Sequence, residues 1–306
     1  MDWRSACRTG SLHAQNPPSP EQLATKEDSI VTELVGRLFG DEEIEAATPI
    51  ASGWTNRVLR LTRRGGDVVA RLPRPGAIVD VAARRREAEV WSRAAAAAVV
   101  PAPLLIDVEA GILVTPVVAE RNLRALLGDA RPTRSMLDAL GTLVARFHAI
   151  DPGALPAVDP VARLDADLGR ARRAGVTLDA AVDRARARIP TLTRTVLAHH
   201  DLIPANILVG ERLWLVDLEA SGPGDPEFDL VTLASALRLD AADEARLFAA
   251  AGRPVPERTR LQALRTLFQL SEHAWAAARL AEGRTETGVR EQYETSLAEL
   301  RRGVAD

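Results

Sequence analysis

Among the residues with carboxylate or amide oxygens in residues 197–230, LAHHDLIPANILVGERLWLVDLEASGPGDPEFDL, three are spaced so that they could act together: Asp201, Asn206 and Asp217. Asp201 and Asn206 flank a short loop, and Asp217 follows the run ILVGERLWLV, whose pattern predicts a hairpin. Because Asn206 starts the first strand of this hairpin and Asp217 ends the second, we expect the three side chains to converge. Two carboxylates and an amide oxygen suit Mg²⁺, which binds through one or two carboxylates together with substrate phosphates. The pattern therefore predicts a site for a metal-bound nucleotide.

The spacing of these residues matches the division of roles in phosphoryl transfer. In kinase catalytic loops, an Asp accepts the proton of the acceptor hydroxyl, and an Asn five residues later ligates metal. A later Asp at a strand end is the second metal ligand. We expect Asp201 to be the base, Asn206 and Asp217 to hold Mg²⁺, and His199 to support the turn. The alternative is a solvated surface turn followed by an ordinary hairpin.

The elements that must position these residues fall into two parts. Residues 1–18 have no continuous apolar core, and we expect them to be a disordered leader or to lie upstream of the natural start. Residues 19–118 predict a helix, three strands between residues 44 and 73, a helix over VDVAARRREAEVWSRAAAAA and two more strands. Residues 119–306 are mainly helical, with short strands only near residues 196, 207–209 and 213–216. The predicted class is α+β, with a five-stranded antiparallel N-terminal sheet, one helix on it and a larger helical C-terminal lobe.

Composition excludes several classes of protein. The 306 residues carry a formal net charge of −3, so the basic surface of a nucleic-acid binder is missing. Lys26 is the only lysine, which excludes a P-loop and a lysine Schiff base in the rest of the chain. Cys7 is the only cysteine, which excludes an intramolecular disulfide and fits a cytoplasmic setting. The longest apolar run, AAAAAVVPAPLLI, is too short and too rich in alanine to span a bilayer.

HHDLIPANILV, followed by LWLVDLEASGPGDPEFDL, resembles the catalytic and metal-binding segments of the choline kinase and aminoglycoside phosphotransferase superfamily. Glu219 and the motif GDPEFDL are most similar to its choline/ethanolamine kinase branch, to which bacterial thiamine kinases are related. SGWTNRVLRL resembles the nucleotide loop of that branch, and VVARLP resembles its strand with a basic phosphate ligand. The resemblance spans roughly residues 44–280 and implies a two-lobed protein-kinase-like fold that uses ATP and Mg²⁺.

The same resemblance implies roles for residues of the N-terminal lobe. Arg71 ends the third strand, where a kinase places the basic residue that binds the nucleotide phosphates, and its planar fork suits phosphate. Its ion-pair partner is either Glu87 or Glu89, which lie about 200° apart on a helix, so only one can face the sheet. The expected nucleotide-loop residues are Gly53, Thr55 and Asn56, although a plain hairpin turn explains their spacing equally well.

The acceptor pocket is less defined by the sequence. The superfamily branch usually has Asn where His200 stands, and aromatic residues where Leu218 and Ala220 stand, which weakens the case for choline itself. An aromatic cage could still form from Trp275, Phe228, Trp214 or Tyr293. Glu219 and Glu227 could give the pocket negative charge. Asp225 is expected either to cap the next helix or to line this pocket, and Asp229 to accept backbone hydrogen bonds from the catalytic loop.

The function expected from these residues is ATP-dependent phosphorylation of a hydroxyl on an amino alcohol such as choline or ethanolamine, or on a related cationic metabolite. The alternatives are a phosphotransferase for aminoglycosides or other antibiotics, a thiamine kinase, and a catalytically silent nucleotide-binding scaffold. The expected partner is a small-molecule acceptor, with no nucleic acid and no membrane span.

Overall fold

A computed structural model of the chain describes residues 38, 44–52, 56–74, 79–284 and 287–303. The predicted N-terminal helix over residues 19–40 falls almost entirely outside this range. The chain forms two compact units, which are described separately. The sheet unit comprises the described residues up to 122 together with 208–219, and the helical unit comprises 123–207 and the described residues from 220 onward. The hairpin that carries Asp217 thus belongs to the sheet unit, whereas the loop of Asp201 belongs to the helical unit.

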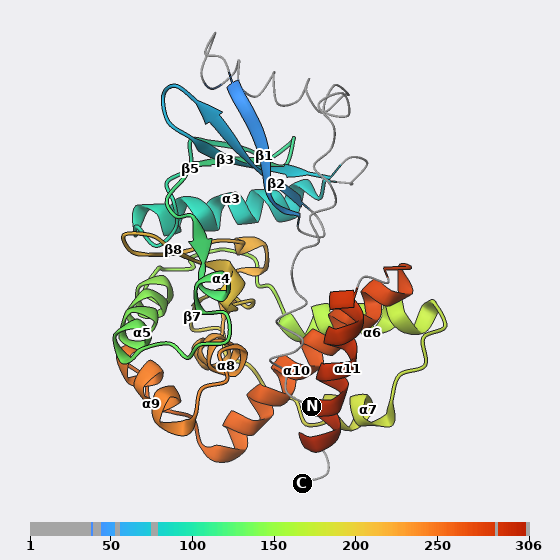
Figure 1. Ribbon diagram of the computed structural model, residues 1–306. Helices are drawn as coiled ribbons and strands as arrows, with labels where there is room; N and C mark the ends of the chain where they lie inside the picture. The colour runs from blue at the N-terminus through green and yellow to red at the C-terminus, as the bar shows by residue number, and fades with distance from the viewer. Residues whose placement is uncertain (1–37, 39–43, 53–55, 75–78, 285–286, 304–306) are drawn as a thin grey trace. The chain divides into compact units, whose positions relative to one another are not determined.

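A five-stranded antiparallel sheet forms the centre of the sheet unit (Figure 1). Its order is β1 (Ile44–Ser52), β2 (Asn56–Arg63), β3 (Val68–Pro73), β5 (Ile112–Pro116) and β4 (Leu105–Asp107). The predicted RRGGD turn joins β2 to β3, and its Gly66 has the positive φ of 102° that a glycine adopts without strain. Helix α3 (Val81–Ala96) lies alongside this sheet. The expected sheet with one helix is confirmed.

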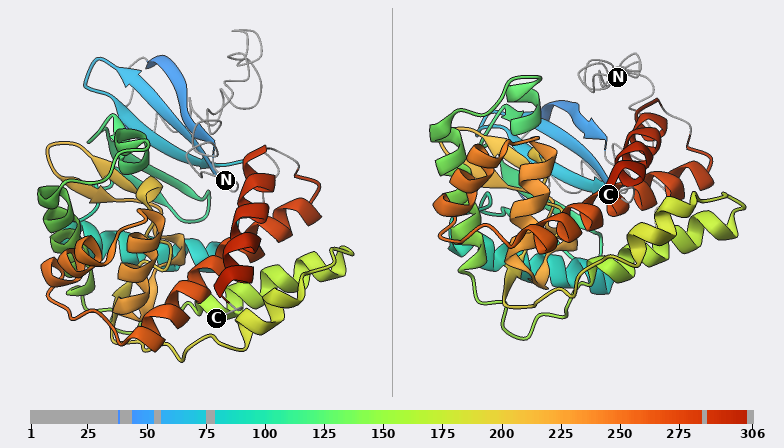
Figure 2. Two further views of the ribbon diagram at one scale, coloured as in Figure 1. Left: turned by 60° about the horizontal axis from the view of Figure 1, so that its bottom comes forward. Right: turned by 90° about the horizontal axis from the view of Figure 1, so that it is seen from below.

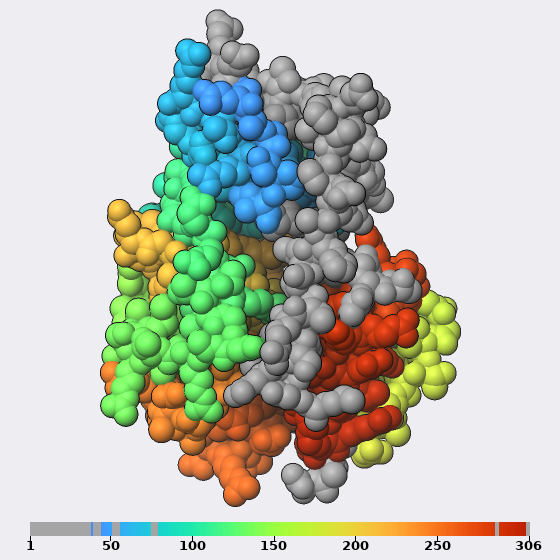
Figure 3. All heavy atoms as spheres, in the orientation of Figure 1, coloured from blue at the N-terminus to red at the C-terminus, as the bar shows by residue number. Residues whose placement is uncertain are grey.

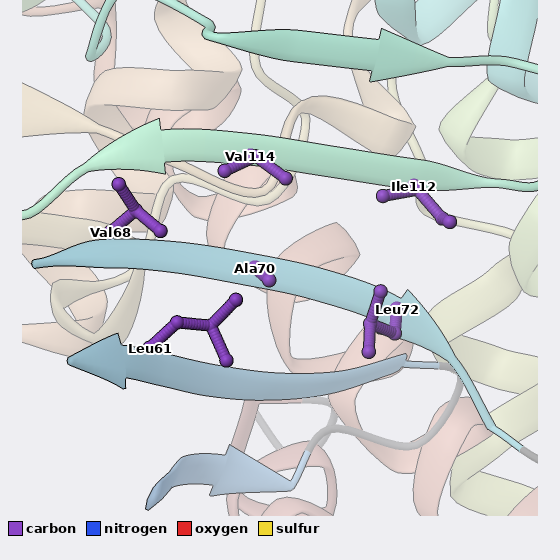
Figure 4. Close-up of a cluster of buried hydrophobic side chains, with 6 residues drawn as sticks. All are labelled: Leu61, Val68, Ala70, Leu72, Ile112 and Val114. Carbon is purple, nitrogen blue, oxygen red and sulfur yellow. The ribbon is translucent and has the colours of Figure 1, made fainter. Parts of the chain in front are cut away.

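The two faces of β3 carry different chemistry. Val68, Ala70 and Leu72 are buried and join Ile112 and Val114 of β5 in one apolar cluster (Figure 4). Full burial of a valine, leucine or isoleucine side chain contributes about 1.5–3 kcal/mol of hydrophobic stabilisation. Because successive side chains of a strand point to opposite faces, Arg71 lies on the other face, which also contacts α3. The apolar periodicity of β3 therefore fixes the direction of its single charged residue.

A small second sheet continues the sheet unit. Its strands are β6 (Arg121–Asn122), β8 (Ile207–Val209) and β9 (Leu213–Leu215), in the order β6-β8-β9. The sequence predicts the hairpin of β8 and β9 but not β6, which is only two residues long. Gly210, directly after β8, lies against the carbonyl oxygen of Val118, where a Cβ would approach to 2.1 Å. A glycine is therefore required at this position.

The helical unit contains α4 (Leu123–Leu127), α5 (Arg134–His148), α6 (Pro160–Arg173), α7 (Ala180–Arg186), α8 (Pro226–Ala236), α9 (Ala241–Ala250), α10 (Arg258–Ala281) and α11 (Thr287–Gly303). Two short strands, β7 (Val196–Ala198) and β10 (Gly222–Gly224), pair antiparallel. Helices α7 and α9 and strand β10 were not predicted. Both helices begin at an aspartate, Asp179 and Asp240, that accepts hydrogen bonds from backbone N–H groups of the first turn.

Helix α10 is the centre of packing in the helical unit. It contacts α6, α7, α8 and α11. Both views of Figure 2, which turn the bottom of the molecule toward the reader, show α6, α10 and α11 side by side. In the space-filling view, red residues of α10 and α11 form one continuous surface (Figure 3).

Helix α5 packs closely on α9. The approach is close enough that a Cβ at Gly141 would lie 2.5 Å from that of Ala250. Among the described residues, no helix has the length and apolar character needed to span a membrane.

Candidate active site

Arg71 and Glu87 form a buried ion pair between β3 and α3 in the sheet unit. Nη1 of Arg71 donates to Oε1 of Glu87, and Nη2 donates to Oε2 at 2.8 Å. The Glu87 side chain is 3% exposed, whereas Glu89 is 55% exposed and pairs with Arg93 on its own helix. Of the two glutamates considered as partners of Arg71, Glu87 is therefore the one that faces the sheet.

Electrostatics keep both members of this pair charged. Burial disfavours the ionised carboxylate of Glu87, but hydrogen bonds and charge interactions with Arg71 and Arg84 outweigh burial and lower its pKa. Burial likewise disfavours the Arg71 cation, yet the bonds to Glu87 raise the pKa of Arg71 overall. The charges of Asp217 and Glu219 raise the pKa of Arg71 further. The face of β3 near α3 therefore combines a fixed cation with nearby carboxylates.

A second arginine of α3 joins this pair. Nη1 of Arg84 donates to the same Oε2 atom of Glu87 at 2.8 Å, and Nη2 donates to Oδ1 of Asn56 at 2.9 Å. Asn56 is the first residue of β2 and is buried. Of the predicted nucleotide-loop residues, only Asn56 lies in the described part of the chain, and Gly53 and Thr55 lie outside it.

Asp217 and Glu219 follow β9 in the sheet unit. Asp217 has a positive φ of 64°, which is uncommon for a residue other than glycine but is tolerated by aspartate. Oε2 of Glu219 lies 3.8 Å from Nη1 of Arg84, and its main-chain oxygen accepts a hydrogen bond from Arg86 at 3.0 Å. These arginines favour a role for Glu219 in the α3 network over the predicted one in the acceptor pocket, because they already offset its charge.

The residues expected to form the catalytic loop lie in the helical unit between β7 and β8. Asp201 follows β7, and Asn206 ends the 3₁₀ turn η2 (Pro204–Asn206). Nδ2 of Asn206 donates to the main-chain oxygen of Asp201 at 2.9 Å and to its Oδ2 at 3.0 Å. These bonds orient the carboxylate of the expected base. They also leave Oδ1 as the remaining acceptor of the Asn206 amide, which is the atom type that a Mg²⁺ ion requires.

Asp229 of α8 supports the loop from within the core. This fully buried carboxylate accepts hydrogen bonds from the backbone N–H groups of His199 at 2.7 Å and His200 at 2.8 Å. It also accepts a bond from Nε2 of His148 at 2.9 Å. Burial alone would raise the pKa of Asp229, but His148 outweighs it, so the pKa lies below its usual range. This is the support geometry expected of Asp229, with His148 as a member that the sequence did not indicate.

His200 occupies a strained position directly before Asp201. Its φ is 62°, and its Nδ1 bonds to the main-chain oxygen of Ala220 at 3.0 Å. Because a carbonyl can only accept, Nδ1 carries the proton in this bond. Burial lowers the pKa of His200, so the ring stays neutral. Gly224 lies against the ring, where a Cβ would be 2.0 Å from Nε2. The left-handed conformation agrees with the Asn that the resembling sequences carry at this position.

Glu272 of α10 interacts with the charge of Asp201. The sequence did not predict it as a site residue. Its Oε2 accepts a hydrogen bond from Nε2 of Gln292 on α11 at 2.7 Å. Burial and the negative charge of Asp201 raise the pKa of Glu272 to about 7, while Arg124 of α4 opposes this shift. A carboxyl group with a strongly raised pKa next to a candidate base is typical of functional sites. Only the folded environment reveals it, since one glutamate in a helix carries no sequence signal.

The other residues considered for the acceptor pocket have varied surroundings. Asp225 is buried, begins α8 by accepting from the N–H of Glu227 at 3.0 Å, and pairs with Arg260 at 2.5 Å. It therefore has the structural position of a helix cap. Trp275 is partly buried on α10, one turn beyond Glu272. The other cage candidates are engaged elsewhere: Phe228 is buried in α8, Trp214 stacks under Arg212, and Tyr293 packs on His273.

The residues present fit a nucleotide and a metal ion. Nε of Arg71 is buried and has no hydrogen-bond partner among the described residues, so a donor remains for a phosphate oxygen. Within the described ranges, no group of three or more His, Cys, Asp or Glu side chains is arranged to hold a metal. Of the two expected Mg²⁺ ligands, Asn206 of the helical unit carries an amide oxygen and Asp217 of the sheet unit carries a carboxylate. Each of these oxygen types suits an ion that keeps waters and binds phosphates.

Comparison with known proteins identifies the family. The model of the phosphotransferase enzyme family matches residues 46–264. The chain belongs to this family, which confirms that it is a phosphotransferase. No curated protein sequence matches the chain.

Solved structures confirm the two-lobed kinase-like fold. A choline/ethanolamine kinase family protein from Mesorhizobium loti is 25% identical with a TM-score of 0.67, covering 92% of this chain and 95% of that one. Choline kinase LicA from Streptococcus pneumoniae is 15% identical with a TM-score of 0.71, covering 92% and 99%. Macrolide 2'-phosphotransferase MphH from Brachybacterium faecium is 21% identical with a TM-score of 0.62, covering 88% and 98%. The expected resemblance to the choline kinase-like branch is thus confirmed.

Proposed function

We propose that this phosphotransferase transfers the γ-phosphoryl group of ATP to a hydroxyl of an amino alcohol such as choline or ethanolamine, or of a related cationic metabolite. The observation that carries the proposal is the loop in which Asn206 orients the carboxylate of Asp201. The similarity to the choline/ethanolamine kinase family protein supports the acceptor class. LicA, which shares the fold with a TM-score of 0.67, has been solved in complex with AMP, and this supports a nucleotide donor.

Each residue has a proposed task. The Asp201 carboxylate accepts the proton of the acceptor hydroxyl. Arg71, held by Glu87, binds phosphate oxygens through its free Nε–H and the outer N–H groups of its fork. Asn206 and Asp217 hold Mg²⁺, which offsets negative charge on the transferred phosphoryl group when it is bound. His199 and Asp229 keep the catalytic loop in place.

A cationic acceptor fits the surroundings of Asp201. Glu272 adds a second carboxyl group near this residue, and Trp275 lies one turn further along the same helix. Side chains three residues apart on a helix share one face, so a carboxylate and an aromatic ring lie on the same side of α10. A carboxylate and an aromatic face are the groups that recognise ammonium ions. Choline would require more aromatic contact than one ring, so smaller amines fit equally well.

An antibiotic is the second candidate acceptor. The similarity to macrolide 2'-phosphotransferase MphH favours it, since the fold match covers nearly all of both chains. Thiamine remains a third candidate within the cationic metabolites. A catalytically silent nucleotide-binding scaffold is the alternative from another class.

Release of ADP from Mg·ATP distinguishes these functions. The acceptor panel comprises choline, ethanolamine, thiamine, simple sugars, several aminoglycosides and a macrolide, with Asp201→Asn as the inactive control. Turnover on one amino alcohol, lost in the variant, is the expected result. Turnover on an antibiotic alone would transfer the assignment to the second candidate. Nucleotide binding with no turnover on any acceptor would favour the scaffold.

A further inference from the structure

Arg84 of α3 is mostly, though not fully, withdrawn from water and contacts several side chains. Its side chain is 14% exposed, and its two terminal nitrogens contact three side chains from three segments. Nη1 donates to Glu87 at 2.8 Å and lies 3.8 Å from Glu219, and Nη2 donates to Asn56 at 2.9 Å. The guanidinium therefore joins α3 to the start of β2 and to the segment that follows Asp217.

The neighbouring residue shows what an ordinary arginine of this helix does. Arg85 is 71% exposed and pairs with Glu109, itself 72% exposed, at 3.2 Å. An exposed pair of this kind contributes little, because water screens it and two flexible side chains must be ordered. Arg84 differs because it is largely withdrawn from water, where a cation is retained only if its partners compensate for lost hydration. The two residues are adjacent in sequence but lie on different faces of α3.

Sharing of one oxygen atom links Arg84 to Arg71. Oε2 of Glu87 accepts from Nη2 of Arg71 and from Nη1 of Arg84, both at 2.8 Å. Two donors on one oxygen, with a third bond to Oε1, fix the plane of the carboxylate. The direction of Arg71, and of its unpartnered Nε–H, depends on that plane.

We propose that Arg84 is a positioning residue of the nucleotide site, an inference that rests on the proposed function. It holds Glu87 in the orientation that aims Arg71, and it connects Asn56, a predicted nucleotide-loop residue at the start of β2, to the same carboxylate. Glu219 belongs to the same network through Arg84, so its role is in nucleotide binding and not in acceptor binding. Arg84 touches no substrate in this role and acts through Glu87 and Asn56.

Binding of a non-hydrolysable Mg·ATP analogue, measured by calorimetry without acceptor, tests the proposal in the full chain. Arg84→Gln is compared with Arg85→Gln, which removes the same charge from the next residue. We expect Arg84→Gln to weaken binding by about ten- to a hundredfold, the usual effect of losing a charged hydrogen bond. KM for ATP should rise in parallel, with KM for the acceptor unchanged. Equal binding by the two variants would overturn the proposal.

Further variants separate positioning from folding. Arg84→Lys keeps the charge but cannot reach Glu87 and Asn56 together, so it should recover only part of the lost affinity. Asn56→Ala should weaken nucleotide binding less than Arg84→Gln, and the double variant should bind as weakly as Arg84→Gln alone. Effects that multiply in the double variant would overturn coupling through Asn56. If Arg84→Gln lost its affinity for acceptor and for nucleotide and also lost its melting transition, Arg84 would be a merely structural residue. That result would also overturn the proposal.

The wild-type protein distinguishes failure of this inference from failure of the proposed function. A wild type that binds no nucleotide analogue would overturn both. A wild type that binds the analogue and turns over an acceptor, with Arg84→Gln indistinguishable from Arg85→Gln, would overturn only the role of Arg84.

Discussion

The side-chain nitrogen of Asn206 donates to two oxygens of Asp201, the main-chain oxygen at 2.9 Å and Oδ2 at 3.0 Å. One side chain therefore fixes both the turn of the loop and the direction of its carboxylate. The amide is held with its nitrogen toward Asp201, so its oxygen is the only side-chain atom left to contact a cation. The five-residue spacing that suggested two separate roles thus also provides a direct contact between the two residues.

Asp201→Asn should abolish most turnover while the protein still binds nucleotide. The variant keeps the shape of the side chain but cannot accept the proton of the acceptor hydroxyl, and loss of a general base costs about 10²- to 10⁴-fold in rate. Asp129→Asn, at an exposed site in the turn after α4, is the matched control. Single-turnover phosphoryl transfer within tenfold of wild type would exclude Asp201 as the base.

Glu87→Gln should destabilise the sheet unit and weaken nucleotide binding together. The substitution leaves Arg71 and Arg84 facing a neutral amide, and breaking a buried ion pair costs about 3–5 kcal/mol. Glu89→Gln affects only an exposed pair with Arg93 and should change stability by less than about 0.5 kcal/mol. Urea unfolding of both variants measures the difference. Similar values would show that the buried pair contributes no more than the exposed one.

The same carboxylate should contribute to acid sensitivity. The folded state lowers the pKa of Glu87 below its ordinary value of 4.5, so the unfolded chain binds this proton more tightly. Its contribution to stability is then complete above pH 4.5 and is lost as the pH falls through the lower native pKa. Wild type should lose stability over this range more steeply than Glu87→Gln. Parallel acid profiles of the two proteins would contradict this assignment.

Sequence reasoning predicted features that depend on local pattern. The β-type pattern of VVARLP predicted a third strand that carries Arg71, and helical periodicity allowed only one of Glu87 and Glu89 to face the sheet. The sequence pattern could not predict contacts between segments that lie far apart in the chain. His148 lies 81 residues from Asp229, and no spacing rule connects a helix end with the first turn of another helix.

Burial produced the other features that the sequence did not indicate. Arg84 stands in a run of three arginines whose members differ only in the direction they face. Glu272 has an ordinary helical context, and its raised pKa arises from burial by neighbouring segments and from the charge of Asp201. Helix α9 and strand β10 were missed for a related reason, since short elements are stabilised by tertiary packing more than by their own pattern.

Asp229→Asn should loosen the catalytic loop. In the variant, one of the two oxygens that accept from His199, His200 and His148 becomes an NH₂ group, so at least one buried donor faces another donor. Leaving a buried donor unsatisfied next to a lost charge costs about 3 kcal/mol. We expect faster hydrogen exchange at the amides of His199 and His200 and a lower kcat. Unchanged exchange at these two amides would show that Asp229 does not hold the loop.

Removal of Mg²⁺ should stop turnover, and Asp217→Asn should raise the Mg²⁺ concentration needed for half-maximal rate by about tenfold or more. Mg²⁺ binds carboxylate oxygens more strongly than amide oxygens, so the variant keeps the shape of the ligand but loses its charge. Excess Mg²⁺ should restore part of the rate in Asp217→Asn but none in Asp201→Asn. An unchanged Mg²⁺ requirement in the Asp217 variant would exclude it as a ligand.

Glu272→Gln tests the carboxyl group that lies near Asp201. The folded pKa of Glu272 is about 7, above its ordinary value of 4.5, so the folded protein retains this proton more tightly than the unfolded chain. Its ionisation therefore reduces the free energy of unfolding as the pH rises from 4.5 to about 7, and the reduction is complete above that. The variant should match wild type below pH 4.5 and be more stable above pH 7, by on the order of 1–3 kcal/mol.

The activity of the same variant reports on the acceptor. Ionisation of Glu272 adds a negative charge beside Asp201, so wild-type KM for a cationic acceptor should fall as the pH rises through about 7. Glu272→Gln should lose this dependence, because its amide stays neutral, while KM for ATP remains unchanged in both proteins. Glu257→Gln, at the exposed start of α10, is the control and should keep the wild-type profile. A pH dependence that persists in Glu272→Gln would mean that another group binds the cation, and a wild-type KM independent of pH would favour a neutral hydroxyl acceptor.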